Sequence, residues 1–536
     1  MLRLPPFNNS TIPPHPRRQI AGAGLALIVT LGLVGALLAI LAAGGVGTAP
    51  HGGAILALVG LTTLQAGLST LVSIAVGMAL AWALNRLRFF GRGVVIALLS
   101  AAIVTPGIVV AFGLISVWGR AGFIADALTA LTGTRPDFSI FGLGGIIFAH
   151  TILDGAFAAR VLLARLDALP PARLKLGQSL GLRAVERFLV LDWPALRGAL
   201  PGLAAVIFLL AFTSFPIVLM LGGGPANQTI EVAIYAAVRL DFDLGRAVLL
   251  ALVQIGFCAL IVSVSALLRP ASLPTAPSQP SRWRDSRPAR LGAVLVLLGL
   301  GFALLSPLVA VLVEGIPALP VLLTRPTLAP ALLASLAIAS LSSLLAVALG
   351  LIAALARASA TRPLVRLLLG APLLGYLAVP AMVLALGAFL LVRNAGLDPE
   401  RAAPFVLILA NALLVLPFAL ATLGPPLDML AQSRGRLLRS LRLSGTVQFF
   451  AVELPLIRAD LALVLALGFC FSLGDLGIIA LFGTDQFATL PLMMMRALGA
   501  YRSADAAALA ALMLLISGTV FTVLPRLIAK VPDARA

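Results

Sequence analysis

The sequence has few charged residues, and acidic residues are the scarcest of them. Asp, Glu, Lys and Arg together make up 11% of its 536 residues, whereas 61% are hydrophobic and the mean hydropathy is +1.10. A soluble protein needs a largely polar surface, so this composition excludes a soluble globular fold. The long apolar segments indicate a protein that crosses a membrane many times.

Other scarce residues exclude whole classes of function. The two cysteines, Cys258 and Cys470, lie in apolar runs, and the three histidines are far apart, so we expect neither a disulfide framework nor a metal site. The chain has no GxxxxGK[ST] loop and therefore no P-loop for ATP. Because it has only four tryptophans and three tyrosines, we attribute the net charge of +18 to the membrane flanks and not to nucleic-acid binding.

Apolar segments of spanning length predict an all-α membrane protein with about twelve transmembrane helices. The first, residues 20–43, follows a basic tail at 1–19 and is too long for the core of a signal peptide, so we expect it to be retained. The polar linker 269–290 divides the helices into two sets of six. The other segments cover residues 56–85, 93–118, 140–163, 200–222, 246–268, 291–313, 330–356, 367–392, 402–424, 460–482 and 505–528.

The placement of lysine and arginine predicts the orientation of these helices. With the N-terminus inside, 29 of the 38 basic residues fall in segments on the cytoplasmic side and nine fall outside. This excess places both termini, the linker 269–290 and the tail 529–536 in the cytoplasm. An odd number of helices in the first half would invert the second half and remove the bias.

Two polar stretches repeat at a fixed distance. Residues 179–197 align without a gap on residues 440–458, 261 positions later, with six identities. An acid, Asp192 or Glu453, stands two residues before the proline of each stretch. A repeat of this kind predicts two copies of one architecture.

The similarity continues outside the polar stretches. The matched positions are 69–86 with 340–357, Pro106 with Pro380, and Gly113 with Gly387. Because each half holds an even number of helices, the copies are parallel and related by an axis along the membrane normal, with a path between them. We therefore expect a first permease half at 20–268 and a second at 291–528, with repeated cores at about 57–266 and 330–525.

The two polar stretches resemble the cytoplasmic signature loop of bacterial ABC-importer permeases. Gly181 and Pro194 have the spacing of thirteen that the glycine and proline of that loop have, although its EAA triplet is degenerate in both copies. Proline at 170 and 171 favours a helix start, which predicts a short helix at 172–182 on the cytoplasmic face. The resemblance implies that this helix docks into a separate ATP-binding subunit. The alternative is an amphipathic helix that lies on lipid headgroups.

The resemblance also implies which residues couple to that subunit. They are Leu176, Ser179, Leu180, Gly181 and Pro194 in the first copy, and Ser440, Leu441, Leu443 and Pro455 in the second. We expect Gly181 to be a turn or close-approach residue. Arg442 replaces that glycine in the second copy, so we do not expect the two docking sites to be equivalent.

Acidic residues at membrane depth indicate a path for a cargo. A carboxylate in lipid is unfavourable and usually faces a pathway or a basic partner. Asp475 aligns on Ser214, which follows Thr213, and we expect these three residues and Asp154 to line the path. The alternative for Asp154 is a pair with Arg160, and for Asp475 it is a hydrogen bond to a neighbouring helix.

The loops expected on the outer side carry several further acids. An acidic mouth would suit a cationic solute or a basic partner, whereas ordinary solvated loop charge is the alternative. These residues are Glu231, Asp241, Asp243 and Asp485.

Three long segments, residues 214–254, 472–491 and 500–515, carry a more specific resemblance. On them, and outside the N-terminal tail and the linker, the chain resembles the fused permeases of the thiamine (vitamin B1) transport family, which consist of two MetI-like halves. It implies thiamine uptake across the bacterial inner membrane, with a periplasmic thiamine-binding protein and an ATP-binding subunit, expected as a homodimer, under the two loops. It also implies that ATP and Mg²⁺ belong to that partner, so that this chain is not an enzyme and binds no cofactor.

Two other functions stay open at this point. The first is the same machine with ferric iron or another small solute as cargo. The second is an ion-coupled secondary transporter, a class that usually places several titratable groups in the membrane. Here only Asp154 and Asp475 qualify clearly.

Overall fold

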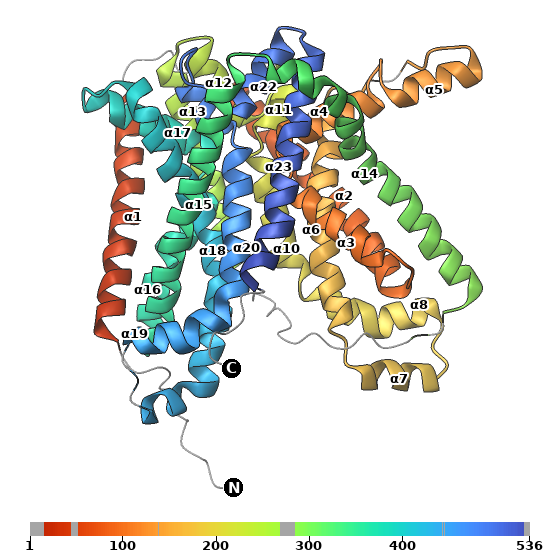
Figure 1. Cartoon of the computed structure of the whole chain (residues 1–536), viewed down its shortest axis with the longest axis vertical. Helices are drawn as coiled ribbons and strands as arrows, with labels where there is room; N and C mark the ends of the chain where they lie inside the picture. Colours follow the sequence, from red (N-terminus) through yellow and green to blue (C-terminus); the bar gives the residue numbers. More distant parts are fainter. Residues whose placement is uncertain are drawn as a thin grey trace. The chain divides into compact units, whose positions relative to one another are not determined.

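The computed structural model describes residues 15–43, 52–137, 139–267, 283, 285–441, 443 and 445–529. Within these ranges every regular element is a helix (Figure 1). In this part of the chain, ten helices are long and apolar enough to cross a membrane, and two bent pairs bring the number to as many as twelve. The prediction of an all-α, multi-pass membrane protein is confirmed.

The described chain forms two compact units. Unit 1 takes its residues from Met1–Val46, Ala329–Thr489 and Thr519–Ala536, and unit 2 from Gly47–Leu328 and Leu490–Gly518. Unit 1 contains α1 (Pro16–Ala43), α15 (Leu328–Ser359), α16 (Pro363–Leu374), η3 (Gly375–Ala378), α17 (Ala381–Asn394), α18 (Pro399–Ser440), α19 (Gly445–Gln448), η4 (Phe449–Glu453), α20 (Leu454–Leu473), α21 (Gly477–Phe482) and the end of α23 (Ser503–Ala529).

Unit 2 is built around α2 and α6, between which Leu80, Ile152 and Leu162 are fully buried. Its elements are α2 (Gly52–Arg86), α3 (Arg92–Ile103), α4 (Gly107–Trp118), α5 (Phe123–Thr132), α6 (Leu143–Asp167), α7 (Pro171–Ser179), α8 (Ala184–Arg187), η1 (Phe188–Asp192), α9 (Trp193–Arg197), α10 (Leu200–Phe212), α11 (Pro216–Leu221), η2 (Pro225–Asn227), α12 (Ile230–Arg239), α13 (Leu244–Leu267), α14 (Arg287–Leu323), α22 (Leu490–Gly499) and the start of α23.

Each unit contains the first helix of the other sequence half. Helix α1 begins the first half but packs in unit 1 against α16 and α17 (Figure 1). Helix α14 begins the second half but packs in unit 2 against α2 and α4. We call α1 and α14 the exchanged helices. The expected halves at 20–268 and 291–528 therefore follow the sequence repeat, whereas the compact units cut across it, and most of the linker 269–290 lies outside the described residues.

Equivalent glycines lie where the exchanged helices make close contact. A Cβ at Gly387 would stand 2.8 Å from the Cβ of Ala36 in α1, and a Cβ at Gly113 would stand 2.3 Å from the carbonyl oxygen of Pro307 in α14. Only a residue without a side chain permits such an approach. The sequence match between Gly113 and Gly387 thus marks the same helix crossing in each unit.

Two of the expected spans, 93–118 and 367–392, are not continuous helices. In unit 2 the chain breaks between α3 and α4 at Pro106, and in unit 1 it breaks before α17 at Pro380, where the helix axes bend by 101°. Proline cannot donate a backbone hydrogen bond, and it disfavours the helical conformation in the residue before it. Val379 is accordingly extended, with φ −100° and ψ 107°.

A second pair of breaks lies at positions that the 261-residue repeat relates. Residues 213–215 separate α10 from α11, and residues 474–476 separate α20 from α21. The expected spans 200–222 and 460–482 are therefore interrupted at the residues proposed for the cargo path.

Candidate functional site

The first polar stretch forms the short helix α7, which ends three residues earlier than expected. Pro171 occupies its first turn, as the sequence predicts. Leu174 is buried, whereas Leu176 is 61% exposed and Leu180 is 69% exposed. Helix α7 is therefore anchored by one leucine and leaves two leucines uncovered.

Gly181 ends α7 in a Schellman motif. Its φ is +71°, its N–H donates to the carbonyl of Gln178 at 3.0 Å, and the N–H of Leu182 donates to the carbonyl of Gly177 at 3.1 Å. Open space surrounds the position of a Cβ among the described atoms, so the backbone conformation is what requires glycine. Gly181 is the turn residue expected from the sequence. Before it, the hydroxyl of Ser179 donates to the carbonyl of Lys175.

The second polar stretch is organised differently at its start. Helix α18 runs for 42 residues and continues through the stretch to Ser440. The positions that align on Pro170 and Pro171 hold Ala431 and Gln432, which do not end a helix.

The exposed leucines nevertheless recur in the second stretch. Leu437 and Leu441, the counterparts of Leu176 and Leu180, are 55% and 56% exposed. The hydroxyl of Ser440 donates to the carbonyl of Leu437 at 2.8 Å, and Leu443 is half-buried. Arg442 lies outside the described residues.

Beyond the leucines the two stretches have the same order of elements. A single α-helical turn (α8 or α19) leads into a π-helical segment (η1 or η4), and an α-helix follows (α9 or α20). Pro194 and Pro455 lie in the first turn after the π-helical segment. A proline in a helix clashes with the carbonyl one turn earlier, so the wider π-helical turn accommodates its ring. The last residue of each π-helical segment is the buried acid, Asp192 or Glu453.

In unit 1 the buried acid is held by the start of an exchanged helix. The guanidinium of Arg18 in α1 donates to both carboxylate oxygens of Glu453, at 2.8 Å and 2.9 Å. Gln448 donates to the same carboxylate at 2.6 Å, and the imidazole Nε2 of His15 lies 3.4 Å from the Gln448 side-chain oxygen. Arg18 also donates to the carbonyl of Gly445 at 3.0 Å. Glu453 is completely buried, so these partners replace the water that it has lost.

In unit 2 the equivalent acid lies in a cluster of four charges. Asp192 accepts from Arg187 at 3.4 Å and from Arg86 at 3.3 Å. Arg86 also pairs with Asp285, and the guanidinium of Arg187 stacks on the ring of Trp283 at 4.7 Å from its centre. Two arginines and two aspartates balance one another, which makes their burial tolerable.

Sequence reasoning found the two acids but missed their partners. Arg18 is 435 residues from Glu453, and no local pattern links residues so far apart. The pair Arg187 and Asp192 is different, because a spacing of five residues places both on one face of a π-helical turn. That spacing was the available signal, and position 448, which holds glutamine, repeats it in the second copy.

Asp475 lies in the break between α20 and α21. Its Oδ1 accepts a hydrogen bond from the N–H of Ile478 at 3.3 Å, which caps the first turn of α21. Next to this break, Asn411 in α18 donates to the hydroxyl of Ser472 at 3.0 Å, and both side chains are buried. Asp475 therefore has a local structural bond, in addition to any role toward a cargo.

Thr213 and Ser214 occupy the corresponding break of unit 2. The hydroxyl of Thr213 donates to the carbonyl of Leu209 at 2.8 Å, and Ser214 is half-buried. Thr213 and Ser214 belong to unit 2 and Asp475 belongs to unit 1, so each break is described by the contacts within its own unit.

Asp154 lies buried in the middle of α6, and its partner is not the one suggested by the sequence. His150, one turn earlier, places Nδ1 3.4 Å from Oδ2 of Asp154. Arg160 was the expected alternative, but residues four apart share a helix face whereas residues six apart do not. The structure therefore assigns His150 as the neighbour of this carboxylate.

Among the acids that the sequence places on the outer side, Glu231 does not belong to an exposed mouth. It is completely buried in α12 and accepts a hydrogen bond from Gln254 at 3.1 Å. Asp241, in contrast, forms a partly exposed pair with Arg246 at 3.2 Å, which is ordinary loop charge.

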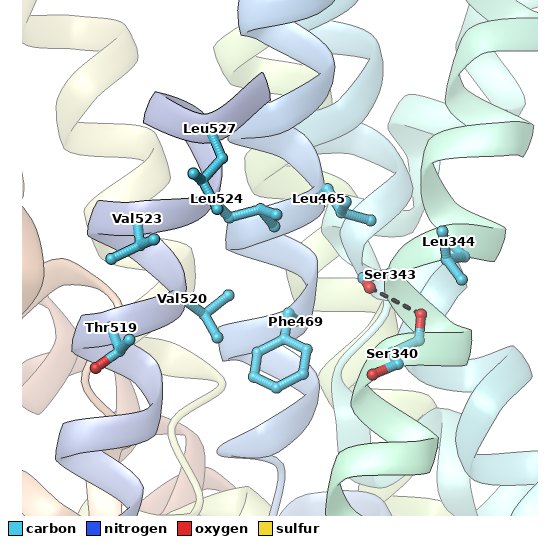
Figure 2. A pocket seen from close by; sticks show the side chains of 10 residues that line it. All are labelled: Ser340, Ser343, Leu344, Leu465, Phe469, Thr519, Val520, Val523, Leu524 and Leu527. Carbon is cyan, nitrogen blue, oxygen red and sulfur yellow. Dashed lines mark hydrogen bonds between the residues drawn. The ribbon is translucent and has the colours of Figure 1, made fainter. Parts of the chain in front are cut away.

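A largely apolar pocket of about 390 Å³ lies in unit 1 between α15, α20 and α23. Figure 2 shows the ring of Phe469 beside Ser340 and Ser343, with the aliphatic side chains of α23 opposite. The hydroxyl of Ser343 donates to the carbonyl of Ser340. The described residues that line this pocket do not include Asp475, so the pocket and the helix break are separate features of unit 1.

Comparison with known proteins identifies the class to which this architecture belongs. No family model matches the chain. Three curated relatives are each described as thiamine transport system permease protein ThiP. They come from Salmonella typhimurium (39% identical over 481 residues, 88% of each chain), Escherichia coli (38% over 472 residues, 86% of this chain and 87% of the relative) and Brucella melitensis (35% over 521 residues, 95% of each chain).

A shorter relative matches only part of the chain. It is described as a probable molybdenum ABC transporter permease protein of Haloferax volcanii and is 30% identical over 241 residues, which are 45% of this chain and 86% of its own length. One ABC permease thus corresponds to about half of the present sequence. The protein is a fused permease of the ABC-importer class, a multi-pass protein of the inner membrane. Within that class, the chain belongs to the thiamine transport system permease family.

Proposed function

We propose that this chain is the membrane-spanning subunit of an importer that carries thiamine across the bacterial inner membrane. The observation that supports the proposal is the similarity to thiamine permeases over 86% to 95% of the chain. The matched length includes both halves, and therefore both polar stretches and the helix breaks at 213–215 and 474–476.

In this proposal a separate ATP-binding subunit docks onto the two polar stretches. The exposed leucines, Leu176 and Leu180 in unit 2 and Leu437 and Leu441 in unit 1, supply the apolar contacts. Covering one leucine side chain contributes about 1.5–3 kcal/mol. The residues that shape the stretches around these leucines are Ser179, Gly181, Pro194, Ser440, Leu443 and Pro455.

The remaining partners follow from the same reasoning. The chain has no P-loop, so ATP and Mg²⁺ bind to the partner subunit, and the permease itself makes and breaks no covalent bond. A periplasmic binding protein delivers thiamine to the outer side.

The cargo path runs past the helix breaks. Thiamine carries a permanent positive charge on its thiazolium ring, and a cation in a low-dielectric gap needs a carboxylate or a dipole nearby. Asp475 provides the carboxylate in unit 1, and Thr213 and Ser214 provide polar groups at the equivalent break in unit 2. Asp154, which lies beside His150, is a further candidate in α6.

The test is uptake of radiolabelled thiamine by cells that lack their own thiamine permease but contain the ATP-binding subunit and the binding protein. We expect uptake that depends on both partners and on ATP, and that excess unlabelled thiamine inhibits. If ferric iron inhibited uptake and unlabelled thiamine did not, the cargo would be ferric iron and not thiamine. Uptake that needs only an ion gradient and no ATP would identify a secondary transporter and overturn the proposal.

A further inference from the structure

The buried acids of the two polar stretches share a kind of partner that the sequence repeat does not explain. In unit 1, Arg18 belongs to the first turn of the exchanged helix α1. In unit 2, Asp285 stands two residues before the exchanged helix α14 and reaches Asp192 through Arg86. Each acid is therefore tied to the beginning of the helix that the other sequence half contributes.

A ring also contacts the equivalent position in each unit, by a hydrogen bond in unit 1 and by stacking in unit 2. His15 lies beside Gln448, and Trp283 stacks on Arg187, which is the residue equivalent to Gln448. Each ring comes from the residues that lead into an exchanged helix. The ring of Trp283 also reaches α7, because a Cβ at Gly177 would lie 3.2 Å from it. We call His15 and Arg18 the clamp of unit 1, and Trp283 and Asp285 the clamp of unit 2.

The clamp of unit 1 connects the polar stretch to the length of α1. Arg18 grips Glu453 at one end, Gln19 donates to the carbonyl of Ser359 at 2.9 Å, and the hydroxyl of Tyr376 donates to the carbonyl of Val29 at 3.2 Å. At the other end Ala36 lies against Gly387 of α17. A single helix thus touches the stretch near the ATPase surface and the helix that follows the break at Pro380.

We propose that these clamps position the ATPase-docking stretches, so that movement of a stretch is passed to the exchanged helix and from there to the broken helix beside it. The inference rests on the proposed function, because it assigns a role within ATP-driven transport. A two-pronged guanidinium–carboxylate contact suits this role, since it fixes direction as well as distance. Arg18 and Glu453 are positioning residues and touch no cargo.

The experiment uses the full chain, reconstituted in proteoliposomes with its ATP-binding subunit and binding protein. The quantity measured is the amount of radiolabelled thiamine transported per ATP hydrolysed. The decisive variant carries both Arg18→Gln and Glu453→Gln, because it removes the clamp without leaving a buried charge unpaired. We expect it to reach the membrane and to retain the ATPase, yet to transport at least about fivefold less thiamine per ATP, the lower end of the range for allosteric coupling.

Two further variants sharpen the result. Arg17→Gln removes one positive charge at an exposed neighbour of Arg18 and should leave the ratio at the wild-type value. Arg18→Lys keeps the charge but not the two-pronged contact, so its ratio should lie between those of the double variant and the wild type.

Three outcomes decide the inference. A wild-type ratio in the double variant would overturn it. Loss of the ATPase from the purified double variant would also overturn it, because the pair would then shape the docking surface and not transmit movement. Failure of the wild-type complex to transport thiamine would instead refute the proposed function. That result comes from the wild-type sample, so the two failures can be told apart.

Discussion

The two polar stretches are copies of one design that are anchored in different ways. In unit 2 the chain breaks at Pro170 and Pro171, and α7 is a separate helix closed by Gly181. In unit 1 the long helix α18 continues into the stretch without a break. Two leucines at equivalent positions are nevertheless exposed in each stretch, and an acid at the end of a π-helical segment is buried in each.

The partners of the buried acid differ as well. Glu453 has one arginine, Arg18, whose side chain is still 14% exposed. Asp192 faces two arginines that are both almost completely buried. The comparison teaches that the repeat preserves where the carboxylate lies and which surface stays uncovered, while the residues that neutralise the carboxylate are free to change.

The largest effect should come from removing the acid of unit 2. Asp192→Asn leaves two buried arginines with one carboxylate, and breaking a buried pair costs about 3–5 kcal/mol. Glu453→Gln should cost less, about 1–3 kcal/mol, because Arg18 is near solvent and keeps its bond to Gly445. Thermal unfolding of the detergent-solubilised proteins measures both. Glu186→Gln, at an exposed acid of the same stretch, is the control. If Asp192→Asn and Glu453→Gln lowered the free energy of unfolding equally, the two acids would not be anchored differently.

The next largest effect concerns the uncovered leucines. Leu180→Ser and its equivalent Leu441→Ser should each remove about 1.5–3 kcal/mol of apolar contact with the ATPase, which is roughly a ten- to hundredfold loss of affinity. We expect the larger loss for Leu180, because Arg442 already alters the second stretch. Titrated co-purification of the ATPase provides the measurement. Leu240→Ser, at an equally exposed leucine after α12, should have no effect, and an effect as large as that of Leu180→Ser would remove the argument for docking.

A smaller effect is expected at Gly181. Asn and Asp both enter the left-handed region at a cost of about 1 kcal/mol, so either substitution carries nearly the same backbone strain. Only Gly181→Asp also places a charge beside the docking surface. In the same titration, Gly181→Asp should therefore weaken ATPase binding more than Gly181→Asn does. If Gly181→Asp and Gly181→Asn weakened ATPase binding equally, the whole effect would come from the backbone conformation of the turn.

The smallest effect on folding, and the sharpest test of the path, lies at the helix breaks. Asp475→Asn and Asp475→Ser keep a side chain that can cap α21, so each should change the free energy of unfolding by less than about 1 kcal/mol. Initial rates of thiamine uptake, normalised to the amount of permease in the membrane, should fall several-fold because the carboxylate is lost. Rates near the wild-type value would reduce Asp475 to its capping bond with Ile478.

Local features of the fold were predictable from the sequence, and distant ones were not. Hydropathy predicts the spans, and the proline pair at 170 and 171 predicts the start of α7, because both signals act within a few residues. Hydropathy is blind to a break inside an apolar run, so the interruption at Pro106 was missed although its match with Pro380 was seen.

The candidate site divides in the same way. The turn at Gly181 and the repeated positions of the two acids followed from spacing within one stretch, whereas the burial of the acids did not. The exchange of α1 and α14, and with it the bond between Arg18 and Glu453, joins residues that are hundreds of positions apart. A single sequence carries no periodicity that would relate them.

The exchanged helices also set the order in which this protein is completed during synthesis. Helix α1 enters the membrane first, but its neighbours α16 and α17 follow only after the whole first half and α14 have been made. At about 5–20 residues per second, the ribosome needs on the order of tens of seconds to reach them. Unit 2 likewise takes α14, α22 and the start of α23 from the second half, so it too is completed only late in synthesis. Each unit therefore contains helices from both halves, and joining the halves in one polypeptide supplies those helices in equal number.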